Sequence, residues 1–221
     1  MNNRIRYCAL AACMAALSPV ANAYEAGDWV VRGRVINVDT DRGSSTIRVG
    51  GNSVAGSGVS VNDDVVPELD ITYMINKNWG LELILGTSSH DVDGEGTLAG
   101  LGGIIDAKVL PPTLTLQYHF LPNSHYRPYV GIGLNYTTFY DERVTGGLSA
   151  PGARVSIDSS TGLALQAGID IDINDSWFIN IDVKAIDIDT TANFTNTAVG
   201  PAAVDVDLDP VVFGIGIGTT F

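Results

Sequence analysis

The sequence predicts an all-β protein: an eight-stranded antiparallel transmembrane β-barrel with short periplasmic turns and long extracellular loops. Three observations carry this prediction. Apolar and polar residues alternate in eight segments, the connections between segments are alternately short and long, and the first residues have the features of a secretory signal. An even number of strands is typical of bacterial outer-membrane barrels.

Residues 1–23 are predicted to be a cleaved signal peptide. Arg4 and Arg6 form a cationic start, and an apolar run rich in Ala and Leu follows. The motif Ala21-Asn-Ala23 then supplies the small residues that precede a cut before Tyr24. A second interpretation takes Cys13 as the end of a lipoprotein cleavage box, but the apolar stretch before it is short for that role.

Residues 24–221 are then the mature barrel. Loss of Arg4 and Arg6 leaves 10 basic residues against 25 acidic ones, a net charge of −15, and no cysteine remains. Such a chain repels phosphate backbones, so nucleic-acid binding is excluded. No later segment approaches the roughly 18 apolar residues that a transmembrane helix needs.

The predicted strands run in order along the mature chain. They are Trp29–Val38, Pro67–Ile75, Trp79–Gly86, Thr113–Phe120, Tyr129–Tyr140, Leu163–Ile173, Trp177–Val183 and Val211–Phe221. The first, second and fifth are less regular, whereas the other five alternate clearly and are therefore strands with one apolar face. The last strand ends on the final residue, so we expect Phe221 to belong to the barrel wall.

The connections differ in length and composition. Tight polar turns are expected at 76–78, 122–127 and 174–176. Long segments rich in Gly, Ser, Thr and Asp lie near 39–64, 90–109, 142–160 and 190–208 and are predicted to be loops.

Alternation also separates two faces of the wall. In the fourth strand Leu114 and Leu116 share one side, while Thr115 and Gln117 share the other. A soluble lipocalin-type barrel would turn the apolar side inward, but a small lumen has no room for the large residues of eight strands. We therefore expect the apolar side to face lipid. The tryptophans lie beside short turns or near the N-terminal end, as in an interfacial aromatic girdle: Trp29, Trp79 and Trp177.

The inward residues nearest the short turns are predicted to form a charged floor. They are Arg32, Arg34, Glu68, Asp70, Glu82, Asp170, Asp172, Asp182 and Lys184. Acidic residues outnumber basic ones, so several carboxylates must share the same cations or accept other hydrogen bonds.

Nearer the long loops the inward positions become apolar, and Ile84, Ile186, Ile188 and Val212 are predicted to line a hydrophobic lumen. The alternative is that these side chains pack against each other and fill it. Pro111-Pro112 removes two adjacent ladder donors, which predicts a lateral opening in the wall. The alternative is that these prolines only end a strand.

Several longer motifs carry a family resemblance. Leu110-Pro-Pro-Thr-Leu114, Arg127-Pro-Tyr-Val-Gly-Ile-Gly-Leu-Asn-Tyr-Thr-Thr-Phe-Tyr140, Ile186-Asp-Ile-Asp-Thr-Thr-Ala-Asn-Phe194 and Leu208-Asp-Pro-Val-Val-Phe-Gly214 resemble the OmpW family of outer-membrane proteins. The resemblance begins at Tyr24 and covers the mature chain.

This resemblance implies an outer-membrane barrel whose apolar lumen is closed toward the periplasm, as in the related AlkL-type porters of hydrophobic solutes. It implies small hydrophobic solutes, outer-membrane lipids and lipopolysaccharide as partners. Terminal Phe221 looks like the signal that the barrel-assembly machinery reads. Traits that depend on the long loops do not carry over, because the departures from the family lie there.

The sequence offers little catalytic or metal-binding material, and we expect no enzyme activity and no cofactor. Ser88 and His90 resemble part of a hydrolase site, but no third group is placed to orient the imidazole. The run that starts at Asp170 lacks the Gly and Glu of a calcium loop. Asp205, Asp207 and Asp209 are candidates for divalent ions shared with lipopolysaccharide phosphates, although a solvated acidic loop is the simpler interpretation.

The leading functional hypothesis is a passive outer-membrane channel for small hydrophobic molecules, with lateral exit into the bilayer. The second is a structural or surface-interaction barrel whose interior is filled and inert.

Overall fold

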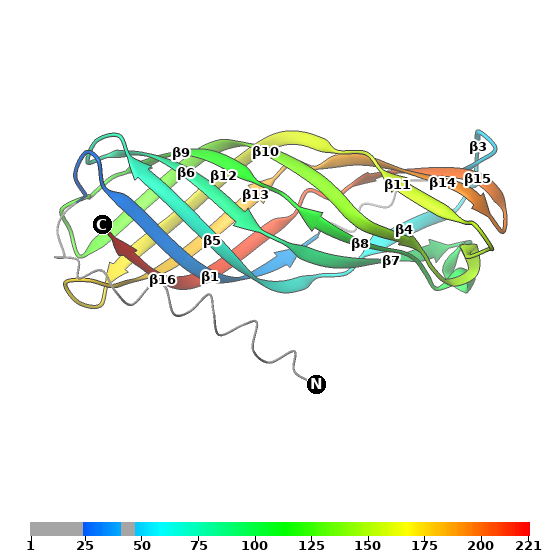
Figure 1. The fold of residues 1–221 in the computed structure, drawn as a ribbon, viewed down its shortest axis with the longest axis horizontal. Helices are drawn as coiled ribbons and strands as arrows, with labels where there is room; N and C mark the ends of the chain where they lie inside the picture. The colour runs from blue at the N-terminus through cyan, green and yellow to red at the C-terminus, as the bar shows by residue number, and fades with distance from the viewer. Residues whose placement is uncertain (1–23, 41–46) are drawn as a thin grey trace.

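The computed structural model describes residues 24–40 and 47–221, and it confirms the predicted eight-stranded antiparallel barrel. The barrel strands are β1 (Trp29–Asp39), β5 (Asp64–Met74), β6 (Trp79–Gly86), β9 (Thr113–His119), β10 (Tyr126–Val144), β12 (Ser160–Asp172), β13 (Phe178–Ile186) and β16 (Val211–Thr220). Each pairs with the next, and the tilted strands surround one long axis (Figure 1).

The first and last strands close the barrel. β1 pairs with β16 over Val30 to Asp39, and with β5 on its other side. The backbone N–H of Trp29 donates to the carbonyl of Phe221 at 3.0 Å, and the N–H of Phe221 donates back at 2.9 Å. The final residue therefore belongs to the wall, as the sequence predicts.

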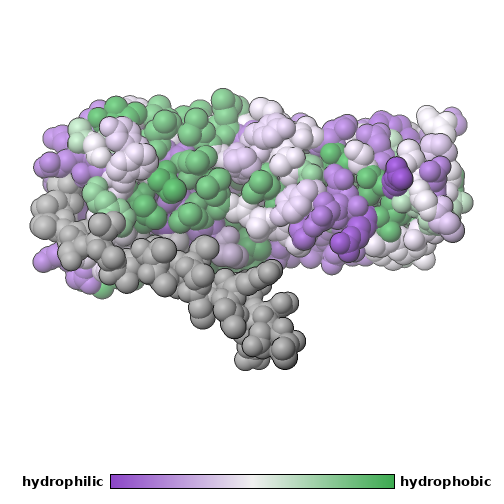
Figure 2. Space-filling view, in the orientation of Figure 1, coloured by the Kyte–Doolittle hydropathy of each residue, from purple (hydrophilic) through white to green (hydrophobic). Residues whose placement is uncertain are grey.

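The outer face of the barrel is apolar. On β9, Leu114 and Leu116 are exposed while Thr115 and Gln117 are buried, which is the predicted assignment of the two faces. Green side chains accordingly cover much of the barrel half in Figure 2, and the other half is more polar. At the short-turn end Trp29 packs on Tyr73, with ring centroids 5.1 Å apart, in the expected aromatic girdle.

The long connections contain strands of their own, so the prediction that 39–64, 90–109, 142–160 and 190–208 are loops is wrong in large part. From the upper half of β10, the barrel sheet continues through β8 (Gly103–Leu110), β7 (Ser88–Gly96) and β4 (Ser57–Val61). A second sheet comprises β11 (Arg154–Ile157), β14 (Asp189–Thr197), β15 (Gly200–Asp207), β2 (Arg48–Val49) and β3 (Asn52–Ser53).

Two short 3-10 helices, η2 (Ala99–Leu101) and η3 (Gly146–Leu148), complete this region, which we call the extension. It prolongs the barrel on the side away from the short turns (Figure 1). On β7 and β14 the inward positions include Ser88, His90 and Ala192, which are polar or small, so hydrophobicity does not alternate visibly in those strands.

The interior is layered along the barrel axis. A small apolar cluster of Tyr24, Val30, Met74 and Phe178 lies at the short-turn end, and a larger apolar cluster lines the upper lumen and the interior of the extension. Polar side chains separate the two. Gly218 opposes Phe178 across β16 and β13, and a Cβ on that glycine would lie 2.3 Å from the aromatic ring. Glycine is thus required there for the ring to pack against the wall.

Residues 1–23, the predicted signal peptide, lie outside the described residues. Across residues 24–40 and 47–221 no helix is long and apolar enough to cross a membrane.

Candidate functional site in the lumen

Arg32 organises the lower part of the predicted charged floor. Its guanidinium donates to both carboxylate oxygens of Asp170, at 2.8 and 3.1 Å, and to Glu82 at 3.1 Å. Thr72 accepts a further hydrogen bond at 2.9 Å. All four side chains are fully buried, and two-point binding between guanidinium and carboxylate fixes both groups in one geometry.

Arg34 and Lys184 organise the upper part. Arg34 lies 2.6 Å from Asp70, 3.0 Å from Glu68 and 3.1 Å from Asp182. Lys184 donates to Glu68 and lies 3.4 Å from Asp182. Glu68 and Asp182 are thus shared between the two cations, as the excess of acidic residues requires.

The structure brings eight of the nine predicted floor residues together, and we call these eight the floor network. They are Arg32, Arg34, Glu68, Asp70, Glu82, Asp170, Asp182 and Lys184. The ninth, Asp172, lies at the barrel rim, where it pairs with Arg127. Five carboxylates and three cations lie together in the lumen here, on the side of the short turns, and all eight side chains are buried.

Two tyrosines complete the floor network. The Tyr24 hydroxyl donates to Asp170 at 2.6 Å, and the Tyr129 hydroxyl donates to Asp182 at 3.0 Å. The guanidinium of Arg127 lies 4.7 Å from the centre of the Tyr24 ring. Sequence reasoning missed all three: Tyr24 precedes the first strand and has no alternation to place it, whereas inward parity along β10 would have indicated Tyr129 and Arg127.

An apolar chamber lies above the floor network, with a cavity volume of about 90 Å³. One water needs roughly 10–15 Å³ on this measure, so the chamber has room for several waters or a small organic molecule. Its wall contains the four predicted lumen residues, Ile84, Ile186, Ile188 and Val212, and Glu68 reaches it from below. These apolar side chains therefore surround a space rather than fill it completely.

The wall of the chamber is interrupted next to Pro111. The β6–β9 ladder runs from Trp79 to Ile84, and the β7–β8 ladder resumes in the same register at Ser88. That register sets Gly86 opposite Pro111. In an antiparallel ladder every second opposed pair is hydrogen-bonded. Asn78 and His119 are such a pair in this register, because the His119 N–H donates to the Asn78 carbonyl. Gly86 and Pro111 lie a whole number of such steps away, so they occupy a hydrogen-bonding position.

Pro111 has no N–H to give to Gly86. Within the described chain no backbone hydrogen bond joins these two residues, and the carbonyl of Pro111 accepts from Asn135 and Thr113 side chains instead. The β5–β6 register likewise sets Thr87 opposite Pro67, and these are also unbonded in the described backbone. The Gly86 amide therefore has no hydrogen bond toward Pro111 and the Thr87 amide has none toward Pro67, although Gly86 still lies in register with Glu68 of β5.

Pro112 acts on the opposite neighbour. It faces Tyr136 of β10, whose N–H donates to the Pro112 carbonyl at 3.0 Å. Farther up, Thr138 pairs with Leu110, so β10 stays attached to this strand on both sides of the prolines. The predicted interruption at Pro111-Pro112 thus exists only on the β6 side, where Gly86, Thr87 and Pro111 all line the chamber.

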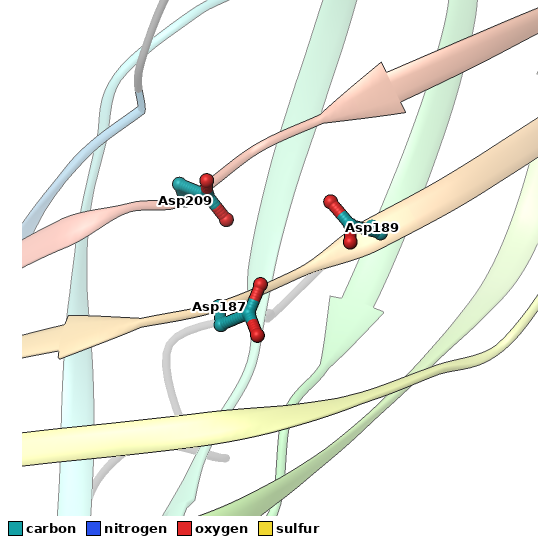
Figure 3. A group of neighbouring side chains, drawn as sticks. All are labelled: Asp187, Asp189 and Asp209. Atoms are coloured by element: carbon teal, nitrogen blue, oxygen red, sulfur yellow. The ribbon is translucent and has the colours of Figure 1, made fainter.

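An acidic cluster lies outside the lumen, at the base of the extension. Asp187, Asp189 and Asp209 each bring a carboxylate oxygen within 4.8 Å of the others, and all three are exposed (Figure 3). Loss of hydration raises the pKa of Asp189, and so does repulsion by Asp207, Asp187 and Asp209. Asp205, predicted beside Asp209, instead lies 2.7 Å from Arg48.

Comparisons with known proteins agree with this architecture. The model of the OmpW family matches residues 25–221. Outer membrane protein W of Vibrio cholerae is 38% identical, over 97% of this chain and 98% of that protein. The dibenzothiophene metabolism operon protein PahQ of Pseudomonas aeruginosa is 33% identical, over 89% of this chain and 90% of that protein.

Solved structures are similar over the same length. The crystal structure of OprG from Pseudomonas aeruginosa has a TM-score of 0.83 and 38% identity, and it covers 90% of this chain and 98% of its own. The structure of AlkL in lipid bilayers has a TM-score of 0.69 and 25% identity, and it covers 93% and 95%. The family match, these relatives and the closed eight-stranded wall together show that the chain belongs to the OmpW family of outer-membrane proteins.

Proposed function

We propose that this protein is a passive channel for small hydrophobic molecules in the outer membrane. A solute enters from the extension, occupies the chamber beside Ile84 and Ile186, and leaves sideways into the bilayer between Gly86 and Pro111. The observation that carries the proposal is one chamber that is apolar, blocked below by the floor network and bordered by an unpaired part of its wall.

The energetics favour a sideways exit over straight descent. Apolar surface gains about 25 cal/mol per Å² when it leaves water, so an apolar solute is stabilised in the chamber and again in lipid. Descent would require the solute to separate buried ion pairs such as Arg34 with Asp70 and Asp182. Breaking one buried pair costs roughly 3–5 kcal/mol, which is more than a small, mostly apolar solute can offset.

The name of one relative suggests a suitable probe. PahQ is named for an operon of dibenzothiophene metabolism, and dibenzothiophene is a small apolar aromatic molecule. That name describes PahQ alone, but it supports the use of a small aromatic hydrocarbon as the test solute for this chain.

The two adjacent prolines allow a matched test of the exit. Pro111→Ala supplies an N–H that faces the Gly86 carbonyl and should close the ladder on the β6 side. Pro112→Ala supplies an N–H toward Tyr136, where the wall is already bonded. We expect Pro111→Ala to lower aromatic-solute uptake by cells lacking other such channels several-fold, and Pro112→Ala to leave it near the wild-type rate.

Equal uptake by the two variants would contradict the Gly86–Pro111 exit. A second variant, Ile186→Arg, tests the chamber itself by placing a bulky charge in its wall, and it should lower uptake wherever the exit lies. Wild-type uptake no faster than that of cells without the protein would instead favour a barrel that acts only through its surface.

A further inference from the structure

Two polar side chains of β7 face the chamber and are hydrogen-bonded to each other. Ser88 and His90 are two residues apart on one face of the strand, and both line the cavity. The Nε2 atom of His90 lies 2.9 Å from Ser88 Oγ, and its Nδ1 atom lies 2.9 Å from the backbone carbonyl of Asn62. The carbonyl is the orienting group that the sequence did not reveal.

These contacts determine where the hydrogens lie. A backbone carbonyl only accepts, so Nδ1 of His90 must be the donor to Asn62. In the neutral imidazole Nε2 then carries no hydrogen and accepts from the Ser88 hydroxyl. The Ser88 hydroxyl donates its one hydrogen to His90, so its oxygen can act toward the chamber only as an acceptor.

The other polar side chains of the chamber wall are also engaged in hydrogen bonds or ion pairs. Four threonine hydroxyls each donate to a backbone carbonyl: Thr40 to Val61, Thr87 to Val109, Thr113 to Pro111 and Thr190 to Asp158. Glu68 is an acceptor held by Arg34 and Lys184. The described side chains of the wall therefore offer acceptors and no free donor. The unbonded amides of Gly86 and Thr87 lie in register with Pro111 and Pro67, so they point along the sheet rather than toward the lumen.

We propose that the chamber selects apolar molecules that carry one hydrogen-bond donor, such as an aliphatic alcohol, and that this donor binds Ser88 Oγ. The inference rests on the proposed function and names its solute class. An alcohol replaces its hydrogen bond to water with one to Ser88. An ether or ester of equal size loses hydration at its oxygen and finds no donor in return.

The same chemistry argues for binding rather than hydrolysis. Hydrogen-bonded Ser and His are a nucleophile and a base, but acyl transfer also needs donors aimed at the developing oxyanion. The side chains described around Ser88 in the chamber offer only acceptors, so an oxyanion would be repelled there.

Two isomers of equal composition test the inference: 1-hexanol and methyl pentyl ether. Each is titrated into the full chain in lipid nanodiscs, and binding is followed through the methyl resonances of Ile84 and Ile186 against the ligand concentration measured in the lipid. One net hydrogen bond predicts that the alcohol binds about three- to tenfold more tightly. Both ligands should shift the methyl resonances.

Substitutions then locate the acceptor. Ser88→Ala removes the hydroxyl that binds Nε2 of His90, so this nitrogen can accept a hydrogen bond from the alcohol instead. The preference for the alcohol should therefore survive, and the Nε2 resonance should shift on titration. The double variant Ser88→Ala with His90→Leu removes both acceptors and should abolish the preference. Thr190→Val, which removes another chamber hydroxyl, should retain it.

The outcomes separate this inference from the proposed function. Equal affinity of the wild type for the two isomers, or a preference that persists in the double variant, overturns the donor site while the channel stands. If neither isomer shifts the Ile84 and Ile186 resonances, the chamber does not bind solutes, and the proposed function and this inference fail together.

Discussion

Tyr24 shows how one residue connects the chain before the first strand to the interior of the barrel. It is buried, donates to Asp170, and packs edge-on against His119 with ring centroids 5.0 Å apart. Asp170 is itself bound by Arg32. The residue thus covers the floor network from below and satisfies one of its carboxylates.

Removal of the Tyr24 hydroxyl should destabilise the folded barrel measurably. Tyr24→Phe keeps the ring contacts and leaves Asp170 without one donor. Hydrogen bonds to charged groups contribute roughly 1.5–3 kcal/mol, so we expect a loss of that order in urea unfolding from lipid vesicles. Tyr126→Phe, at an exposed tyrosine, is the control and should change stability by less than about 0.5 kcal/mol. Equal losses in both variants would show that the hydroxyl of Tyr24 contributes nothing specific.

For single residues, the sequence predicted which face of a strand a side chain lies on, but not which residue it contacts. Parity places Arg34 and Asp182 on the inward face of their strands, because side chains alternate strictly across a sheet. Their ion pair joins residues far apart in the chain, and it depends on barrel closure and strand tilt, which no local pattern encodes. The floor was therefore predictable as a set, and its contacts were not.

β10 is the element that joins the barrel to the extension. Its lower half pairs with β9 through Asn135, and its upper half pairs with β8 from Thr138. One continuous strand thus holds two successive partners, and its register is the same on both sides of the prolines, up to Tyr140. The opposite side of the β8–β9 junction lacks such a bridge, because Pro111 leaves Gly86 unbonded. The wall is therefore hydrogen-bonded on the β10 side of these prolines and lacks a backbone hydrogen bond on the β6 side.

Hydrogen exchange should reveal this asymmetry. The Gly86 amide lacks a ladder partner, whereas the Ile84 amide lies within the β6–β9 ladder. We expect Gly86 to exchange much faster than Ile84 in the folded protein in lipid, because amides outside a ladder need no opening of the structure. Similar protection of both amides would indicate that the wall is closed at Pro111. Pro111→Ala should slow exchange at Gly86, and Pro112→Ala should not.

The whole molecule divides its charge by depth. The apolar belt carries exposed Leu, Ile, Val and aromatic side chains, so the excess of acidic residues is placed in the lumen and in the extension. In the floor network five carboxylates share three cations. Each cation there neutralises more than one carboxylate, whereas each carboxylate belongs to an excess of negative charge.

This imbalance predicts an asymmetric response to neutralisation. Arg34→Met strands Glu68, Asp70 and Asp182 near one remaining cation, so it should cost at least about 3–5 kcal/mol in urea unfolding from lipid vesicles. Asp70→Asn should cost less than about 1 kcal/mol, because it relieves repulsion. Neither oxygen of Asp70 makes a well-aligned hydrogen bond that would be lost.

An exposed pair provides the matched control for the loss of a cation. Arg48→Met removes the partner of Asp205, and both side chains are about half exposed, at 42% and 45%. Solvent screens such a pair, so the loss should stay below about 1 kcal/mol. Comparable losses for Arg34→Met and Asp70→Asn would contradict a surplus of carboxylates and would mean that each floor charge is individually required. The predicted asymmetry would instead mean that the barrel is closed by its three buried cations, with the acidic excess held around them.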